Sequence, residues 1–153
     1  MARARINVNF DSSFEETIKR LYEDKDRETG VGIFETLADL MVFCAMVGRY
    51  RFDDCNGVKF KSKVHPIWTD IIERRRREGV AYLLALDAQE DHSSSGNILR
   101  PENEEEMWDY LQNFAFLGLQ EIEKWFAERP HVEPKDVILD KMKEVAIKEG
   151  LGN

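Results

Sequence analysis

The segment from Ile33 to Val47 constrains the fold more than any other part of this sequence, because it is apolar on nearly every side. A helix without a polar face must be covered all round. We therefore expect it to be the central helix of the domain, or a helix partly buried by another subunit. Its 15 residues fall short of the roughly 18 needed to span a bilayer, so no membrane segment is predicted. Gly48 is expected to end the helix.

The residues before this helix predict a strand and a first helix. Residues 5–10 alternate polar and apolar side chains, which is typical of a short half-buried strand. Ser12 and Ser13 each precede a glutamate by three positions, and this spacing fits a capping box that opens a helix. Further along, a second alternating pattern surrounds Asn56-Gly57, so we predict a small β-hairpin near residues 49–64, with a long loop as the alternative.

The rest of the chain reads as helices. Pro66 suits the first turn of a third helix, and Val80 to Gln89 forms a fourth. A long acidic helix over residues 102–128 has one apolar stripe, and a last helix spans Pro134–Glu149. The stripe of the long helix consists of Met107, Leu111, Phe114, Gly118, Ile122, Trp125 and Phe126.

The predicted fold class is therefore mainly α, with a short N-terminal strand. We expect one domain over residues 1–153, without repeats or linkers. Its expected parts are a strand-helix-helix unit (1–48), a hairpin or loop (49–64), a helical region (65–128) and a C-terminal helix (130–149).

The charge is unevenly distributed. The chain has 22 Lys and Arg against 30 Asp and Glu, a formal net charge of −8. This excludes a uniformly basic nucleic-acid binder but allows a local basic patch, which residues 59–77 could form. Residues 1–80 carry 15 basic and 14 acidic side chains, whereas residues 81–153 carry 7 and 16. Solubility alone is the simpler explanation of this acidity.

The order of strand, capped helix, loop and apolar helix is that of a ribbon-helix-helix unit, although the second helix shows no obvious Ser/Thr cap. In such a homodimer two first strands pair and insert their outward side chains into the major groove of DNA. Arg and Asn recognise guanine and adenine edges, so the candidate base contacts are Arg3, Arg5, Asn7 and Asn9. The candidate phosphate contacts are Lys59, Lys61, Lys63, Arg74, Arg75, Arg76 and Arg77.

Simpler interpretations of these residues stay open. The strand can be an edge strand packed on its own domain. The arginine run from Arg74 to Arg77 spans more than one helical turn, so its members cannot all face one ligand, and such a run is usually a solvated helix end.

No pattern in the sequence predicts catalysis, a metal or a cofactor. The two cysteines and three histidines are scattered and lack zinc-ligand spacing. Gly30-Val31-Gly32 lacks the Lys-Ser/Thr of a phosphate-binding loop. Two cysteines make no disulfide framework, and the N-terminus lacks the apolar stretch of a secretory signal, so we expect a cytoplasmic protein.

The segment Gly32–Gly48 resembles the characteristic helix of the DNA phosphorothioation-associated (Dnd-associated) protein 4 family. Val80–Gln89 and Met107–Trp125 are similar to later helices of that family, and the likeness spans about residues 5–128. The resemblance implies a small cytoplasmic accessory protein encoded near genes that modify or police DNA, with no catalytic residues assigned. The matching positions in the characteristic helix are Phe34, Thr36, Ala38, Asp39, Phe43, Ala45 and Gly48.

Three functions are consistent with these observations. The leading hypothesis is a non-enzymatic accessory of a DNA-modification or phage-defence system that binds DNA as a dimer through its N-terminal ribbon. The second is an adaptor that binds proteins of the system through the apolar helix and the acidic helix, without DNA. The third is an autoregulatory ribbon-helix-helix transcription factor.

Overall fold

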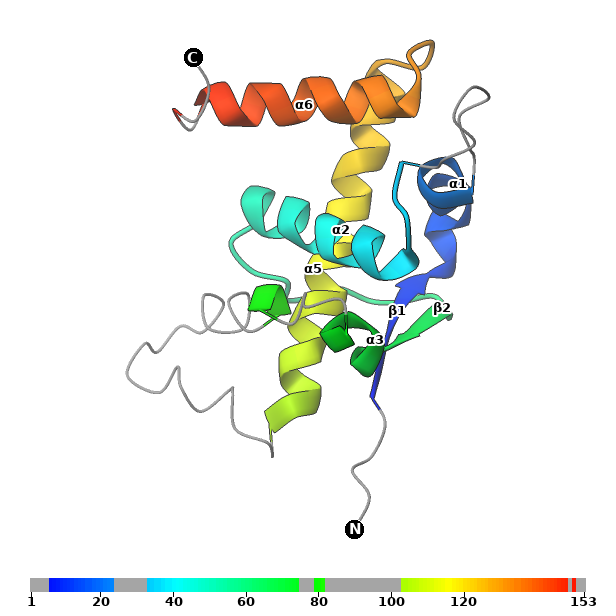
Figure 1. Ribbon diagram of the computed structural model, residues 1–153, viewed down its shortest axis with the longest axis vertical. Coiled ribbons are helices and arrows are strands. Elements are labelled where there is room, and N and C mark those ends of the chain that lie inside the picture. Colours follow the sequence, from blue (N-terminus) through cyan, green and yellow to red (C-terminus); the bar gives the residue numbers. More distant parts are fainter. Residues whose placement is uncertain (1–5, 24–32, 75–78, 82–102, 149, 151–153) are drawn as a thin grey trace.

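Two crossing helices form the centre of the molecule. The computed structural model describes residues 6–23, 33–74, 79–81, 103–148 and 150, and within them the chain is mainly α-helical (Figure 1). Helices α2 (Leu37–Arg51) and α5 (Glu104–Glu128) make the most extensive contact between any two elements. The predicted fold class is confirmed. Of the predicted helix over residues 80–89, only positions 80 and 81 are described, and they are helical.

The two central helices touch backbone to backbone at a pair of glycines. A Cβ atom added to Gly48 would lie 1.9 Å from the backbone oxygen of Phe114, and one added to Gly118 would lie 1.8 Å from that of Cys44. Any side chain at either position would push the helices apart. The prediction that Gly48 ends its helix is therefore wrong: α2 continues to Arg51, and Gly48 permits the close crossing.

The start of α2 also differs from the prediction. The helix begins at Leu37, four residues after Ile33. Thr36 is its N-cap, and its Oγ1 accepts a hydrogen bond from the Asp39 N–H at 3.1 Å. The helix thus has the Thr cap that the sequence pattern did not reveal, because the helix was expected to begin earlier.

A two-stranded antiparallel sheet packs beside α5. Strand β1 (Asn7–Asp11) pairs with β2 (Lys63–Trp68). The hairpin predicted near residues 49–64 is wrong, because residues 49–51 still belong to α2 and the second strand pairs with β1 instead. The Asn56-Gly57 turn is present, with Gly57 at a φ of 82°.

A bulge in β2 explains why Pro66 does not start a helix. Asn9 lies opposite two residues of β2, His65 and Pro66, and His65 adopts a φ of 52° there. Proline has no N–H that could donate a hydrogen bond to the neighbouring strand, so it is tolerated at a bulge of a short strand. Helix α3 (Thr69–Arg74) follows directly after β2.

Asp11 joins the first strand to the first helix. The helical segment consists of η1 (Ser12–Phe14), α1 (Glu15–Ile18) and the π-helical turn η2 (Lys19–Glu23). Its N-cap is Asp11 rather than either predicted serine: the carboxylate accepts hydrogen bonds from the Ser13 N–H and hydroxyl and from two N–H groups of the loop before β2. Burial alone would raise the pKa of Asp11, but these bonds outweigh it and hold the pKa below its ordinary value.

The last helix is attached mainly by its first turns. Helix α6 (Pro134–Lys148) buries only Val137 and Ile138, and an ion pair of 2.7 Å between Arg129 and Asp140 ties it to the end of α5. The helix then extends across the molecule beside α2 (Figure 1). The helix begins at the predicted Pro134 and extends to Lys148, and the predicted last position, 149, lies outside the described residues. The predicted apolar stripe of α5 agrees with the structure, every residue of that stripe being buried.

Candidate functional site

The N-terminal strand, which we predicted to pair with its copy in a second chain, pairs with β2 of its own chain. Thr69 donates its N–H to the Ile6 carbonyl and Ser12 to that of Ser62, so the backbone groups of even-numbered residues face β2. Those of Asn9 face the outer edge, where its N–H donates to Gln112 Oε1 of α5 at 2.8 Å. At Asn9 the outer edge that a second chain would need is therefore occupied by the chain's own helix.

The candidate base-contacting residues are placed accordingly. Asn9 is buried, and its Nδ2 donates to Gln112 and to Oδ1 of Asn7. Its amide groups therefore serve the packing of β1 on α5. Arg3, Arg5, Arg75, Arg76 and Arg77 lie outside the described residues, so their predicted contacts with DNA stay predictions.

Three lysines remain as candidate phosphate contacts. Lys59, Lys61 and Lys63 are exposed, and between the first two lies the half-buried Phe60, whose ring centroid is 5.2 Å from that of Phe116. We call Lys59, Lys61 and Lys63 the lysine row. The pairing of β1 with β2 brings this row next to the N-terminal strand.

Acidic groups interrupt the positive charge around the lysine row. Asp109 of α5 lies close enough for Lys63 to influence its titration. Burial and the neighbouring Glu105 and Glu106 raise the pKa of Asp109, and Lys63 opposes them. Arg74, the remaining candidate, forms an ion pair of 2.9 Å with Asp70 on the same helix. The described part of the predicted basic patch is therefore small and partly neutralised.

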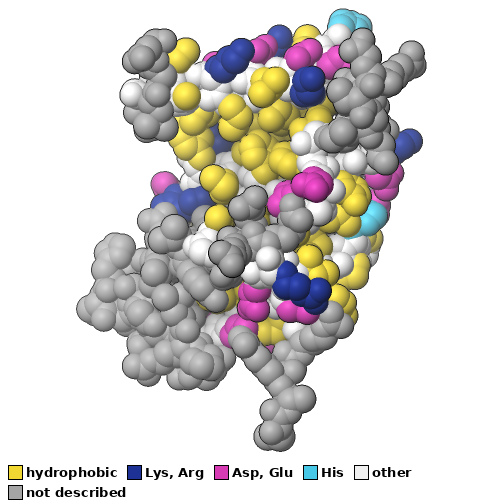
Figure 2. Space-filling view, viewed as in Figure 1, with side chains coloured by type: hydrophobic (Ala, Val, Ile, Leu, Met, Phe, Trp, Pro, Cys, Tyr) yellow, Lys and Arg dark blue, Asp and Glu magenta, His cyan; other side chains and the backbone are white. Residues whose placement is uncertain are grey.

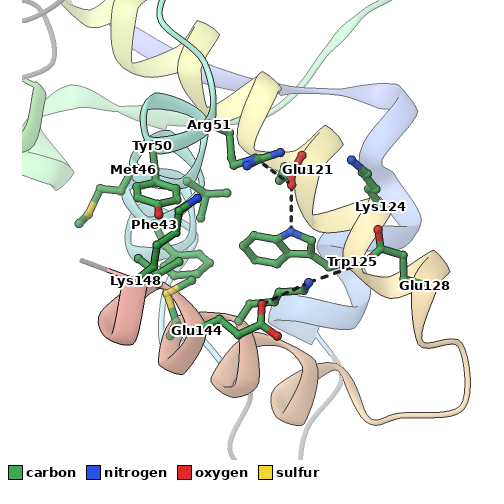
Figure 3. A pocket seen from close by; sticks show the side chains of 14 residues that line it. Phe43, Met46, Tyr50, Arg51, Glu121, Lys124, Trp125, Glu128, Glu144 and Lys148 are labelled. Atoms are coloured by element: carbon green, nitrogen blue, oxygen red, sulfur yellow. Dashed lines mark hydrogen bonds and ion pairs between the residues drawn. The ribbon is translucent and has the colours of Figure 1, made fainter. Parts of the chain in front are cut away.

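A different surface of the described residues contains a hollow. A groove of about 420 Å³ lies between the second half of α2, the last turns of α5 and α6 (Figure 3). Hydrophobic side chains gather there on the surface between α2 and α6 (Figure 2). Its apolar lining consists of Phe43, Met46 and Val47 of α2, Trp125 of α5, and Met142 and Val145 of α6.

The sequence produces this groove in two ways. The apolar character of α2 continues round the helix, so a stripe at Phe43, Met46, Val47 and Tyr50 faces away from the crossing with α5. The second half of α6 does not close over this stripe, because its buried anchors lie only in its first turns. As a result Met46 and Tyr50 remain 53% and 42% exposed.

The charged groups of the groove form two separate sets of ion pairs. Glu121 is buried, and its Oε1 accepts a hydrogen bond from Trp125 Nε1 at 3.1 Å and pairs with Arg51 Nε at 3.2 Å. This contact fixes the indole ring as part of the groove wall. At the opposite wall Lys141 lies 3.7 Å from Glu128 and 3.6 Å from Glu144.

Two lysines of the groove lie outside these sets of ion pairs. Lys124 of α5 and Lys148 of α6 line the groove from different sides (Figure 3). Within the described part of the chain neither forms an ion pair. The lining therefore contains a surplus of positive charge, although the chain as a whole has a formal net charge of −8.

The described residues offer little for catalysis. No three His, Cys, Asp or Glu side chains among them are grouped so that they could hold a metal ion. Burial raises the pKa of the Cys44 thiol far above its ordinary value, and burial with help from Asp54 raises that of Cys55 to about 11. Thiols of this kind are protonated at neutral pH and are poor nucleophiles.

Sequence patterns did not predict the groove as a site. The signal was present in α2, whose apolar residues outnumber those that one crossing helix can cover. Which of them stay uncovered depends on where α6 lies, and nothing in the pattern of α6 specifies its angle to α2.

Comparison with known proteins identifies one family. The model of the DNA sulphur modification system-associated protein 4 family matches residues 5–149, so the match includes α6, which the sequence resemblance had left out. No curated protein and no solved structure matches the chain. Within the described residues, none of the helices has the length and apolar character needed to cross a membrane.

Proposed function

Because the chain belongs to the DNA sulphur modification system-associated protein 4 family, we propose that it serves such a system as a non-enzymatic adaptor. In this proposal a protein of the system docks in the groove between α2, α5 and α6. The observation that carries it is the uncovered apolar stripe of α2, with Met46 53% exposed beside Trp125 and Met142. Apolar grooves with a polar rim are typical of sites that bind protein segments.

Two exposed residues provide a matched test of this proposal. Met46 lines the groove, whereas Leu139, which is 47% exposed on α6, does not. Tagged wild-type chain, Met46→Glu and Leu139→Glu would each be expressed in cells that carry the modification system. Co-purifying proteins would be identified by mass spectrometry, after far-UV circular dichroism has confirmed that both variants fold.

We expect proteins of the sulphur modification system to co-purify with the wild type and with Leu139→Glu. Their recovery with Met46→Glu should fall about tenfold or more, because burying a carboxylate in an apolar contact costs several kcal/mol. Equal recovery with both variants would show that the groove is not the docking site.

The lysine row supports a second candidate function, contact with the DNA backbone. Its three exposed lysines lie at the start of β2 and in the segment just before it, and could contact phosphates without recognising bases. Fluorescence anisotropy with labelled duplex DNA across a salt series would test this function on the wild type and a Lys59→Ala, Lys61→Ala, Lys63→Ala variant. Steeply salt-dependent binding that the variant loses supports backbone contact. Absence of binding at low salt would exclude it for unmodified DNA.

A further inference from the structure

We propose that the occupant of the groove is an amphipathic α-helix of the partner protein, with acidic side chains flanking its apolar face. This inference rests on the proposed adaptor function and specifies the chemistry of the partner. It follows from the shape of the groove, from the residue types that line it and from Lys124 and Lys148, which have no ion-pair partner among the described residues.

The shape of the groove suits a helix. Each wall contributes residues over a similar length of helix: 43–51 of α2, 121–128 of α5 and 141–148 of α6. Eight or nine residues correspond to a little over two turns, or about 12–13 Å. In Figure 3, α2 lies on the left of the groove, α5 at the upper right and α6 along the bottom, so the three helices form a trough. Two turns of a partner helix would lie along this trough and present side chains at i, i+3, i+4 and i+7.

The lining residues favour a protein segment over a rigid small ligand. Met46 and Met142 face the groove from opposite walls, and methionine side chains adapt to irregular apolar surfaces. Tyr50, which is 42% exposed, and the half-buried Phe43 supply aromatic surface of the kind that is enriched at protein interfaces. Met46 and Tyr50 of the lining are exposed, so a helix can reach them without rearrangement of the core.

The charged residues that line the groove favour an acidic partner helix over a basic one. Lys124 and Lys148 have no ion-pair partner among the described residues, whereas Glu121, Glu128 and Glu144 are each already paired. Acidic groups at the edges of the docked helix would complete the two open pairs. The net negative charge of the chain repels an acidic partner only weakly, because salt screens the interaction between charges more than about 8 Å apart under physiological conditions.

Two synthetic peptides provide the probes. Each would be about 15 residues long, close to the minimum for a helix in water, with the same leucine stripe. One would carry glutamates and the other lysines beside the stripe. Binding to the wild type, Met46→Glu, Leu139→Glu, a Lys124→Glu, Lys148→Glu variant and a Lys143→Glu control would be measured by fluorescence anisotropy. Lys143 is exposed on α6 and does not line the groove.

We expect the acidic peptide to bind the wild type at least about tenfold more tightly than the basic peptide. The Lys124→Glu, Lys148→Glu variant should abolish or reverse this preference, whereas Lys143→Glu should keep it. Met46→Glu should lose binding of the acidic peptide and Leu139→Glu should retain it.

Equal binding of the two peptides, or no binding of the acidic peptide up to about 1 mM, would overturn the inference. Sedimentation of the free protein tests whether a second copy of this chain occupies the groove instead. A dimer that Met46→Glu dissociates would show that it does, and would also overturn the inference. These failures are distinguishable from failure of the adaptor function, because partner recovery from cells would still depend on Met46 if another kind of segment docks there.

Discussion

Substitution of Gly48 by alanine should destabilise the protein, although alanine is the better helix former. The added Cβ would lie 1.9 Å from the Phe114 oxygen, whereas ordinary contacts begin near 3.4 Å. Helices α2 and α5 must therefore separate by about 1.5 Å, or one of them must bend. Because the obstacle is backbone rather than a flexible side chain, no rotamer change can relieve it.

The expected magnitude follows from two opposing effects. Overpacking a core costs about 1–3 kcal/mol when side chains can adjust, and here we expect the upper end or more. The gain in helix propensity from glycine to alanine returns about 1 kcal/mol. The free energy of unfolding should therefore fall by about 2–4 kcal/mol, a large share of the roughly 5–15 kcal/mol that stabilises a typical domain.

Urea denaturation followed by circular dichroism at 222 nm would measure this change. Gly79→Ala is the matched control, since a Cβ added at that exposed helical position meets no atom within 4 Å, and its stability should be unchanged or slightly higher. Combining Gly48→Ala with Gly118→Ala should cost less than the sum of the two, because the first already separates the helices. Wild-type stability of Gly48→Ala would refute the backbone contact as the reason for this glycine.

Two further predictions concern buried polar and thiol groups. Asp11→Asn should lower the free energy of unfolding by about 1.5–3 kcal/mol. Because the folded pKa of Asp11 lies below its unfolded value, its contribution is complete above about pH 4 and is lost as the pH falls through the folded pKa. Urea midpoints of wild type and variant should therefore converge below about pH 4, and a constant difference down to pH 2 would contradict the lowered pKa. Cys55, with a pKa of about 11, should react with iodoacetamide only slowly at neutral pH and faster as the pH approaches that value. Cys44 should react only after unfolding, so fast labelling of either thiol in the native protein at pH 7.5 would disprove this burial.

The long amphipathic helix was the most predictable part of the fold. Every residue in its expected stripe, from Met107 to Phe126, is buried, because a period of 3.6 residues specifies which face packs inward. Positions whose role depends on a distant segment were harder to predict. Gly48 can end a helix or permit a close crossing, and only Gly118, far along the chain, decides between them.

The second strand shows the same limit. The Asn56-Gly57 turn was identified correctly, but the strand after it pairs with β1 rather than with residues 49–52. Local alternation predicts a strand without naming its partner. Asn9 has a polar side chain at an apparently outward position, yet it is buried because Gln112 of α5 offers it hydrogen bonds.

The candidate site could be predicted only in part. The apolar character of α2 indicated that this helix must be covered on all sides, by its own domain or by another protein. The structure shows that its own domain covers most of it and leaves Met46 and Tyr50 exposed. The adaptor hypothesis had named α2 and α5 as docking surfaces, but it did not include α6, the third wall of the groove.

Photo-crosslinking in cells that carry the modification system tests the docking groove most directly. The photoreactive amino acid p-benzoylphenylalanine would replace Met46 in one variant and Leu139 in the other. If the groove is the docking site, a covalent adduct with a protein of the sulphur modification system should form from position 46 and none from position 139. Equal adducts from both positions, or none from position 46, would contradict this prediction.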